Sequence, residues 1–213
     1  MIAAYPILKF SKRKKDDIKK MELRNKRIGI LKGNKNLNYD LVKCDDYMKF
    51  IQNRINEGYT RKVIKNAILC VEVMFSISDK EYFDSLTPEE EELFFEKSLE
   101  FIKNKVGEEN IIFATVFKDI KVPSIHVGFI PLKDNHLRIR NFLNDKYEII
   151  DLRDNYYFFI KQFFPNLIQD IIYKSALKSG EYFRIWNEGN YDNIFKRFDY
   201  WRKNVFNIGF WWY

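Results

Sequence analysis

Hydrophobic and polar positions along the chain form patterns typical of both strands and helices. Residues 2–10 start with an apolar run that predicts a first strand, and Pro6 favours a sheet edge because proline cannot donate a ladder hydrogen bond. Residues 66–78, NAILCVEVMFSIS, are rich in β-branched and aromatic side chains and predict a central strand. Residues 111–119 and 124–132 predict two more strands, and the short connection between them favours a hairpin.

Helical patterns fill the spaces between these strands. The segment 87–107 is the clearest, since Thr87 suits the N-cap, Pro88 suits the first helical position and Gly107 suits the end. The remaining helical segments are 14–27, 45–57, a helix over 152–175 interrupted near Pro165, and an amphipathic stretch over 191–205. This order predicts an α+β fold, in which a mostly antiparallel sheet carries helices on one face.

The chain has a basic excess that is unevenly distributed. Its 213 residues include 37 Lys and Arg against 30 Asp and Glu, a net charge of +7. Residues 9–35 are strongly basic, whereas residues 79–109 are acidic. A basic stretch is typical either of a solvated helix face or of contact with a polyanion such as a nucleic acid. The charge alone does not separate these two readings.

Cysteine usage and the N-terminus indicate a reducing compartment. The two cysteines, Cys44 and Cys70, show no pairing pattern, which is typical of a cytoplasmic protein. The first ten residues, MIAAYPILKF, have no charged region ahead of the apolar run and no small-residue cleavage site, so they predict a strand and not a signal peptide. No apolar run has the length needed to span a bilayer, so we expect no membrane partner.

Three short stretches, taken in order, carry a family pattern. They are NYDL at Asn38–Leu41, AILCVEVMFSISDKEYFDSL at 67–86, and GEENIIFATVFKDIKVPSIHVGFIPL at 107–132. They resemble, respectively, the NYDL or NYEL motif, the strand with an acidic residue followed by SD, and the strand with the H-x-D-E-x-T-P-H-x-H motif of the MobV, or Mob/Pre, plasmid mobilisation relaxases. The resemblance implies a relaxase-like domain over residues 1–175, of the kind shared by the histidine-hydrophobe-histidine (HUH) endonucleases. Residues 176–213 remain as an aromatic-rich extension, which we expect to pack on the domain.

The resemblance also implies a chemistry. Relaxases of this family bind a hairpin origin in single-stranded form, hold one divalent metal with histidines and an acidic residue, and cleave one DNA strand by attack of a side chain on a phosphodiester. The metal withdraws charge from the scissile phosphate. The covalent intermediate keeps the phosphodiester energy for rejoining.

Most positions that resemble the metal ligands are replaced in this chain. The four positions are Phe117, Ile120, Ser124 and His126. Only His126 is a good ligand, because phenylalanine and isoleucine have no donor atom and a serine hydroxyl is a poor ligand for a transition metal. With two histidines in the whole chain, a three-histidine site cannot be built. We therefore expect no cofactor, unless Glu72 and Asp119 complete a rebuilt acidic site around His126 for Mn or Mg.

The nucleophile is replaced as well. The family's nucleophilic histidine aligns near ELRNKR, where Arg24 stands in its place. A guanidinium stays protonated and cannot attack phosphorus, but it can bind a phosphate. Tyr39 and Tyr157 are the alternative nucleophiles, and Lys161 follows Tyr157 by one helical turn.

These replacements favour a DNA-binding pseudoenzyme of plasmid or phage mobilisation, recombination or replication, with single-stranded or hairpin DNA as its partner. Two alternatives stay open: a tyrosine-dependent single-strand nickase that uses the rebuilt acidic metal site, and a protein-binding regulator or inhibitor that reuses the relaxase fold. In the second alternative, the aromatic C-terminus is the expected protein contact. The basic residues expected to contact DNA are Arg24, Lys26, Arg27, Lys118, Lys121, Arg138 and Arg140.

Overall fold

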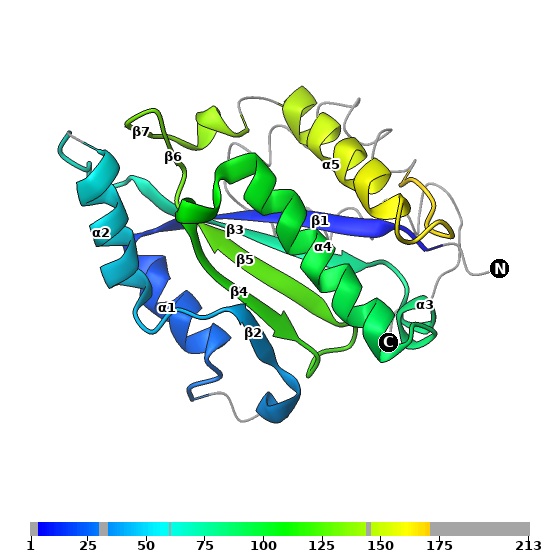
Figure 1. Ribbon diagram of the computed structural model, residues 1–213. Coiled ribbons are helices and arrows are strands. Elements are labelled where there is room, and N and C mark those ends of the chain that lie inside the picture. Colours follow the sequence, from blue (N-terminus) through cyan, green and yellow to red (C-terminus); the bar gives the residue numbers. More distant parts are fainter. Residues whose placement is uncertain (1–3, 30–33, 60, 144–145, 171–213) are drawn as a thin grey trace, which may run out of the picture. The chain divides into compact units, whose positions relative to one another are not determined.

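The computed structural model describes residues 4–29, 34–59, 61–143 and 146–170 (Figure 1). Its centre is a five-stranded sheet in the order β1-β3-β5-β4-β2, in which every neighbouring pair is antiparallel. The five strands are β1 (Pro6–Lys14), β2 (Tyr39–Val42), β3 (Ile68–Ile77), β4 (Ile111–Phe117) and β5 (Ser124–Phe129). A separate small hairpin follows, made of β6 (Leu132–Lys133) and β7 (His136–Leu137).

Five α-helices are described, and short 3-10 turns lie between some of the elements. The helices are α1 (Lys15–Asn25), α2 (Tyr47–Gly58), α3 (Lys80–Asp84), α4 (Pro88–Val106) and α5 (Lys146–Lys161). The start of α4 agrees with its sequence, since the Thr87 side chain accepts from the Glu90 amide and the Glu90 carboxylate accepts from the Thr87 amide. None of the described helices has both the length and the apolar character that crossing a membrane requires.

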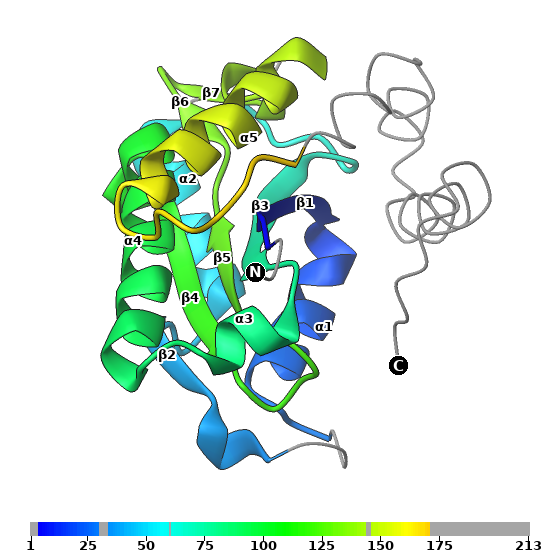
Figure 2. The same cartoon turned by 90° about the vertical axis from the view of Figure 1, so that its right-hand side faces the viewer.

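The two faces of the sheet are covered by different helices, as Figure 2 shows for α1 and α4. On one face, the Phe75 ring packs against Phe101 of α4 and Tyr156 of α5, with centroid separations of 6.5 and 4.8 Å. On the other, the Phe113 ring stacks on Tyr47 of α2 at 4.7 Å. We call these the α4 face and the α1 face.

The predicted α+β class with its antiparallel sheet is confirmed. The prediction that the helices cover one face of the sheet was wrong, because they cover both faces. The reason is that the α1 face also carries apolar side chains that must be covered. A buried cluster joins the apolar stripes of α1 and α2 to residues of the sheet, and it includes Ile18, Met21, Ile51, Cys70 and Phe113.

Several predicted boundaries shift. β1 continues to Lys14, four residues beyond the predicted end, because pairing with β3 supplies backbone hydrogen bonds whatever the side chains are. The edge position predicted from Pro6 is confirmed. The helix predicted over 152–175 begins earlier and ends at Lys161, before Pro165. The amphipathic stretch 191–205 and the C-terminal extension lie outside the described residues, and the domain boundary near residue 175 stays a prediction.

A glycine in β5 shapes the α1 face. Gly128 pairs with Glu72 of β3 on one side and with Phe113 of β4 on the other. A Cβ atom at Gly128 would lie 2.1 Å from Cε1 of Phe113, so the Phe113 ring lies across the bare backbone of β5. The absence of a side chain at this position therefore allows the stack of Phe113 on Tyr47, which holds α2 against the sheet.

Candidate functional site

Glu72 is a buried carboxylate near the middle of the α1 face. Its side chain is 3% exposed. In the register of β3 and β5, Glu72 pairs with Gly128 and Met74 pairs with His126, so the Glu72 and His126 side chains project from the same face. Arg13 of β1 is on this face too, because its partner Cys70 is two residues from Glu72. A charged group buried to this extent requires charged or hydrogen-bonding partners.

Three cationic or hydrogen-bonding side chains engage both oxygens of this carboxylate. Arg13 donates to Oε2 from Nε at 3.0 Å and from Nη2 at 2.6 Å. Oε1 accepts from Nη2 of Arg24 and lies 2.8 Å from Nδ1 of His126. We call Arg13, Arg24, Glu72 and His126 the Glu72 cluster. Burial opposes ionisation of Glu72, but the hydrogen bond and charge of His126 and the charges of Arg24 and Arg13 outweigh it and hold the pKa of Glu72 well below its ordinary value.

Arg24 is held in place from two sides. Apart from Glu72, its guanidinium donates from Nε and Nη2 to Oδ1 of Asn25, at 3.1 and 2.8 Å. Asn25 is buried, and its amide nitrogen is 3.4 Å from the hydroxyl of Tyr47. Arg24 and Arg13 remain 36% and 28% exposed, and within the described ranges no partner is found for Nη1 of either residue. Each guanidinium thus offers N–H groups to an incoming anion while it neutralises Glu72.

Arg27, an expected DNA contact, points into the protein. Its side chain is 15% exposed and forms an ion pair with Asp119, whose side chain is 1% exposed. The guanidinium carbon lies 4.7 Å from the centroid of the Phe117 ring, and that ring meets the His126 ring edge-on at 5.0 Å. Arg27 follows the end of α1 in the left-handed region, with φ of 53°, and this turn directs it inward. Its role in the structure is therefore to fix the end of α1.

The other basic residues expected at a DNA surface are dispersed. Lys26 donates to the Glu22 carboxylate at 2.6 Å and to the backbone oxygen of Asp45. Lys118 pairs with Glu91 of α4 at 2.8 Å, and Lys121 is exposed in the loop between β4 and β5. Arg138 and Arg140 are exposed beyond β7, so they lie at the opposite end of β5 from Lys118 and Lys121 (Figure 1). Of the seven, only Arg24 belongs to the Glu72 cluster.

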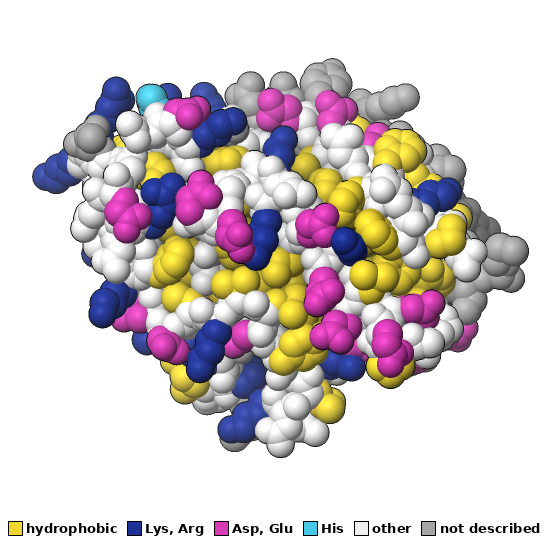
Figure 3. Space-filling model, viewed as in Figure 1, with side chains coloured by type: hydrophobic (Ala, Val, Ile, Leu, Met, Phe, Trp, Pro, Cys, Tyr) yellow, Lys and Arg dark blue, Asp and Glu magenta, His cyan; other side chains and the backbone are white. Residues whose placement is uncertain are grey.

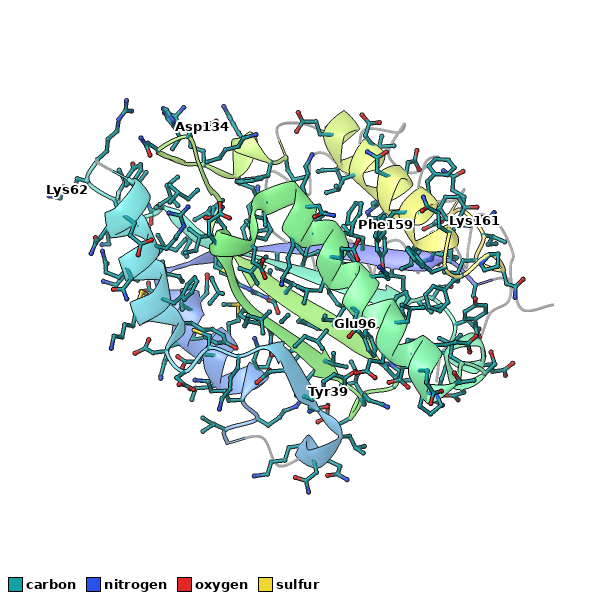
Figure 4. All side chains as sticks on the ribbon, in the orientation of Figure 1. Tyr39, Lys62, Glu96, Asp134, Phe159 and Lys161 are labelled. Atoms are coloured by element: carbon teal, nitrogen blue, oxygen red, sulfur yellow. The ribbon has the colours of Figure 1, made fainter. Side chains whose placement is uncertain are left out.

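Both candidate tyrosines lie on the α4 side of the sheet. Tyr39 pairs with Val116, which shares its face with Phe75 through the register of β4, β5 and β3. Burial, and then the charges of Glu91, Glu92 and Glu96, raise the pKa of Tyr39 to about 12. Tyr157 is on α5, where its hydroxyl accepts from Lys161 at 2.6 Å. The positions of Tyr39, Glu96 and Lys161 can be followed in Figure 4. The sheet therefore separates both tyrosines from the Glu72 cluster.

The metal implied by the resemblance does not fit this set of side chains. The structure brings Glu72 and His126 together but leaves Asp119 in its ion pair with Arg27. Both oxygens of Glu72 are already engaged, and two guanidinium groups beside them repel a further cation. No group of three His, Cys, Asp or Glu side chains that could hold a metal ion converges anywhere in the described part of the chain.

Sequence reasoning missed Arg13, Asn25 and Tyr47 as members or supports of this site. Arg13 is separated from Glu72 by 59 residues, and Asn25 from Tyr47 by 22. The only available signal was the alternation of β1, which places Arg13 on the same face as Ser11. That signal becomes useful only when the register of β1 against β3 is known.

Comparisons with known proteins agree with this architecture. Residues 2–164 match the family model Mob_Pre, described as plasmid recombination enzyme. The plasmid recombination enzyme type 1 of Staphylococcus aureus is 40% identical over 124 residues, which are 56% of this chain and 30% of that protein. A plasmid recombination enzyme of a Bacillus species is 32% identical over 164 residues, which are 72% of this chain and 39% of that protein. The chain thus spans between about a third and two fifths of these relatives.

A solved structure has the same fold. The MobM relaxase domain (MOBV; Mob_Pre), bound to origin-of-transfer (oriT) DNA of plasmid pMV158 in a Mn-bound crystal structure at pH 6.8, is similar with a TM-score of 0.69 and 26% identity. The similarity covers 74% of this chain and 86% of that one. The same relaxase domain bound to a 26-nucleotide pMV158 oriT DNA gives a TM-score of 0.65.

Proposed function

This chain belongs to the Mob_Pre family of plasmid recombination enzymes, and from that premise we propose that it binds plasmid origin DNA, in single-stranded or hairpin form, without cleaving it. The relaxase domain of similar fold is bound to oriT DNA, which supports the DNA partner. The basic excess of the chain favours a polyanion as well.

The observation that carries the proposal is the Glu72 cluster. Two arginines and one carboxylate give it a net charge of +1 before any proton on His126 is counted. The exposed parts of Arg13 and Arg24 present N–H groups to solvent from the two sides of Glu72. Nη1 of each guanidinium can donate its N–H groups to the oxygens of a phosphodiester. The cluster therefore suits the holding of one backbone phosphate.

The same cluster lacks the means to break the phosphodiester. A guanidinium neither attacks phosphorus nor lowers the pKa of a bound water as a divalent metal does. Tyr47, beyond Asn25, is 2% exposed, and burial raises the pKa of its hydroxyl further, so the hydroxyl stays protonated. The nickase alternative would require Tyr39 or Tyr157 to reach a phosphate held on the other face of the sheet.

The test measures binding and cleavage on the same DNA. A fluorescein-labelled hairpin and a single-stranded oligonucleotide of the pMV158 origin are titrated with the full chain at several salt concentrations. We expect binding whose logarithm falls linearly with the logarithm of salt, and no strand break after incubation with Mn²⁺. Absence of salt-dependent binding would overturn the DNA partner, and a covalent protein–DNA adduct would overturn the lack of cleavage.

A further inference from the structure

On the far side of the sheet from the Glu72 cluster, a hollow lies between β2 and α4. It has a volume of about 520 Å³. Leu41 of β2 and Leu99 of α4 supply apolar side chains, and Glu96, Glu100 and Glu108 supply carboxylates. We call this hollow the β2–α4 groove. In Figure 3 hydrophobic side chains run beside α4, with acidic side chains next to them.

The charge of this surface is opposite to that of the chain as a whole. Residues 79–109, which include α3 and α4, contain eleven Asp and Glu and four Lys, a net charge of −7 within a chain of +7. Lys97 and Lys103 pair with Glu100 and Glu108 and neutralise part of it. The remaining acidic excess repels nucleic acid and favours a basic partner.

The groove borders an open strand. β2 is the last strand in the order of the sheet and pairs with β4 alone among the described elements. Asp40, the charged residue of this strand, is turned to the α1 face, where it accepts from the Thr115 hydroxyl at 2.6 Å. Its charge therefore lies away from the α4 face of the sheet, toward which the Tyr39 side chain projects. β2 has four residues and a bulge between Asp40 and Val42, so this open edge beside the hollow can pair only with a short added strand.

We propose that the β2–α4 groove binds an extended segment of a protein partner in which every second residue faces α4, and these residues include both apolar side chains and Lys or Arg. The backbone of that segment pairs with β2, its apolar side chains contact Leu41 and Leu99, and its cations meet the carboxylates of α4. Alternate residues of a strand project to opposite sides, so the apolar residues and the cations that face α4 stand two residues apart in the segment. Because the groove and the Glu72 cluster are on opposite faces, DNA and the partner can be bound at the same time.

The probe is a fluorescein-labelled peptide, Val-Thr-Lys-Thr-Val-Thr-Lys, in which Val and Lys share one side of the strand; it is titrated with the full chain and followed by fluorescence anisotropy. We expect saturable binding, weakened at least about tenfold when alternate peptide nitrogens are methylated, because methylation removes ladder hydrogen bonds. Equal affinity for the methylated peptide would show that the peptide is held by its charge without strand pairing, and it would overturn the proposal. Binding of the unmethylated peptide that does not saturate would also overturn it.

Matched variants locate the site. The double change Glu96→Lys with Glu100→Lys reverses two charges at the groove, and we expect peptide binding to fall at least about tenfold. Glu81→Lys with Asp84→Lys makes the same charge change on α3, outside the groove, and should reduce binding less than about threefold. Leu41→Ser keeps all charges and should still weaken binding. An equal loss in the α3 variant would overturn the proposal whether or not the DNA itself binds. If the DNA binds, displacement of the peptide by origin DNA would overturn it as well.

Discussion

Arg24 and Glu72 form an ion pair that fastens α1 to the third strand of the chain. The guanidinium donates to the carboxylate oxygen that also contacts Nδ1 of His126, and Asn25 holds the same guanidinium from the side of the helix. One residue thus links the helix to the sheet and presents positive charge to solvent.

Replacing Arg24 should weaken DNA binding. In Arg24→Ala we expect the affinity for the pMV158 origin hairpin to fall about tenfold, roughly 1.4 kcal/mol, because one charge-assisted phosphate contact is lost. The slope of log affinity against log salt should fall by about one. Anisotropy titrations at several salt concentrations measure both quantities. Lys19→Ala, an exposed change on the same helix, is the control, and an equal loss there would contradict a specific role for Arg24.

Lowering the pH should destabilise the fold through Glu72. Its pKa is depressed in the folded state, so below the ordinary value of 4.5 the unfolded state binds a proton that the folded state does not. The stabilisation from Glu72 is present above that pH and is lost as the pH falls below it. Urea unfolding between pH 7 and pH 3 measures this dependence. Glu72→Gln should be less stable at pH 7 by about 3 kcal/mol, since two guanidinium groups lose their counter-charge, and its stability should vary less with pH.

A side chain at Gly128 should disturb the packing of the α1 face. The added methyl group of Gly128→Ala would overlap the Phe113 ring, so we expect a loss of about 1–3 kcal/mol in the free energy of unfolding. Near-ultraviolet circular dichroism should report a changed environment for Tyr47. The double variant with Phe113→Leu tests the cause, because a smaller side chain should tolerate the methyl group. Equal destabilisation by Gly128→Ala in both backgrounds would show that the Phe113 ring is not the reason.

Breaking the pair between Arg27 and Asp119 should affect stability more than binding. Arg27→Ala leaves a buried carboxylate without its counter-charge, so we expect a loss of about 3 kcal/mol or more in the free energy of unfolding. DNA affinity of the folded fraction should change less than in Arg24→Ala, since the Arg27 side chain is mostly buried. Denaturation curves and anisotropy on the same preparations compare the two effects. A larger loss of affinity than of stability would show that Arg27 contacts DNA.

Removal of divalent metal should leave DNA binding unchanged. Both oxygens of Glu72 are engaged by side chains of the protein, so EDTA should not alter the affinity for the origin hairpin. Added Mn²⁺ should not raise the Tm, whereas a metal bound to the folded state alone would raise it. Stabilisation by Mn²⁺ that disappears in Glu72→Gln would locate a metal site at the cluster and contradict this expectation.

Local signals in the sequence predicted much of the fold. The two ends of α4 are determined by signals that involve only a few neighbouring residues, and such signals can be recognised without a structure. They are the N-cap Thr87 with the proline after it, and Gly107 at the end. β2, α3 and the β6–β7 hairpin were missed as elements because two to five residues are too few to show a period. The fold class followed from the order of the longer elements.

The site was less predictable because it depends on register. The sequence predicted Arg24 as a DNA contact, and it showed that His126 is one of two histidines in the chain. The position of Arg13 beside Glu72 depends on the pairing of β1 with β3, and a shift of one residue would move Arg13 to the other face. The direction of Tyr39 depends in the same way on the pairing of β2 with β4. The inward turn of Arg27 follows from one backbone angle that composition does not reveal.

The order of the Glu72 cluster along the chain has a consequence for synthesis. Arg13 and Arg24 precede Glu72 by 59 and 48 residues. As the chain leaves the ribosome, β1 and α1 therefore emerge long before the carboxylate that neutralises their arginines. Until β3 has been made and paired, this basic segment has neither its neighbouring strand nor its counter-charge. The first described strand and helix of the chain thus complete their ion pairs only after the third strand arrives.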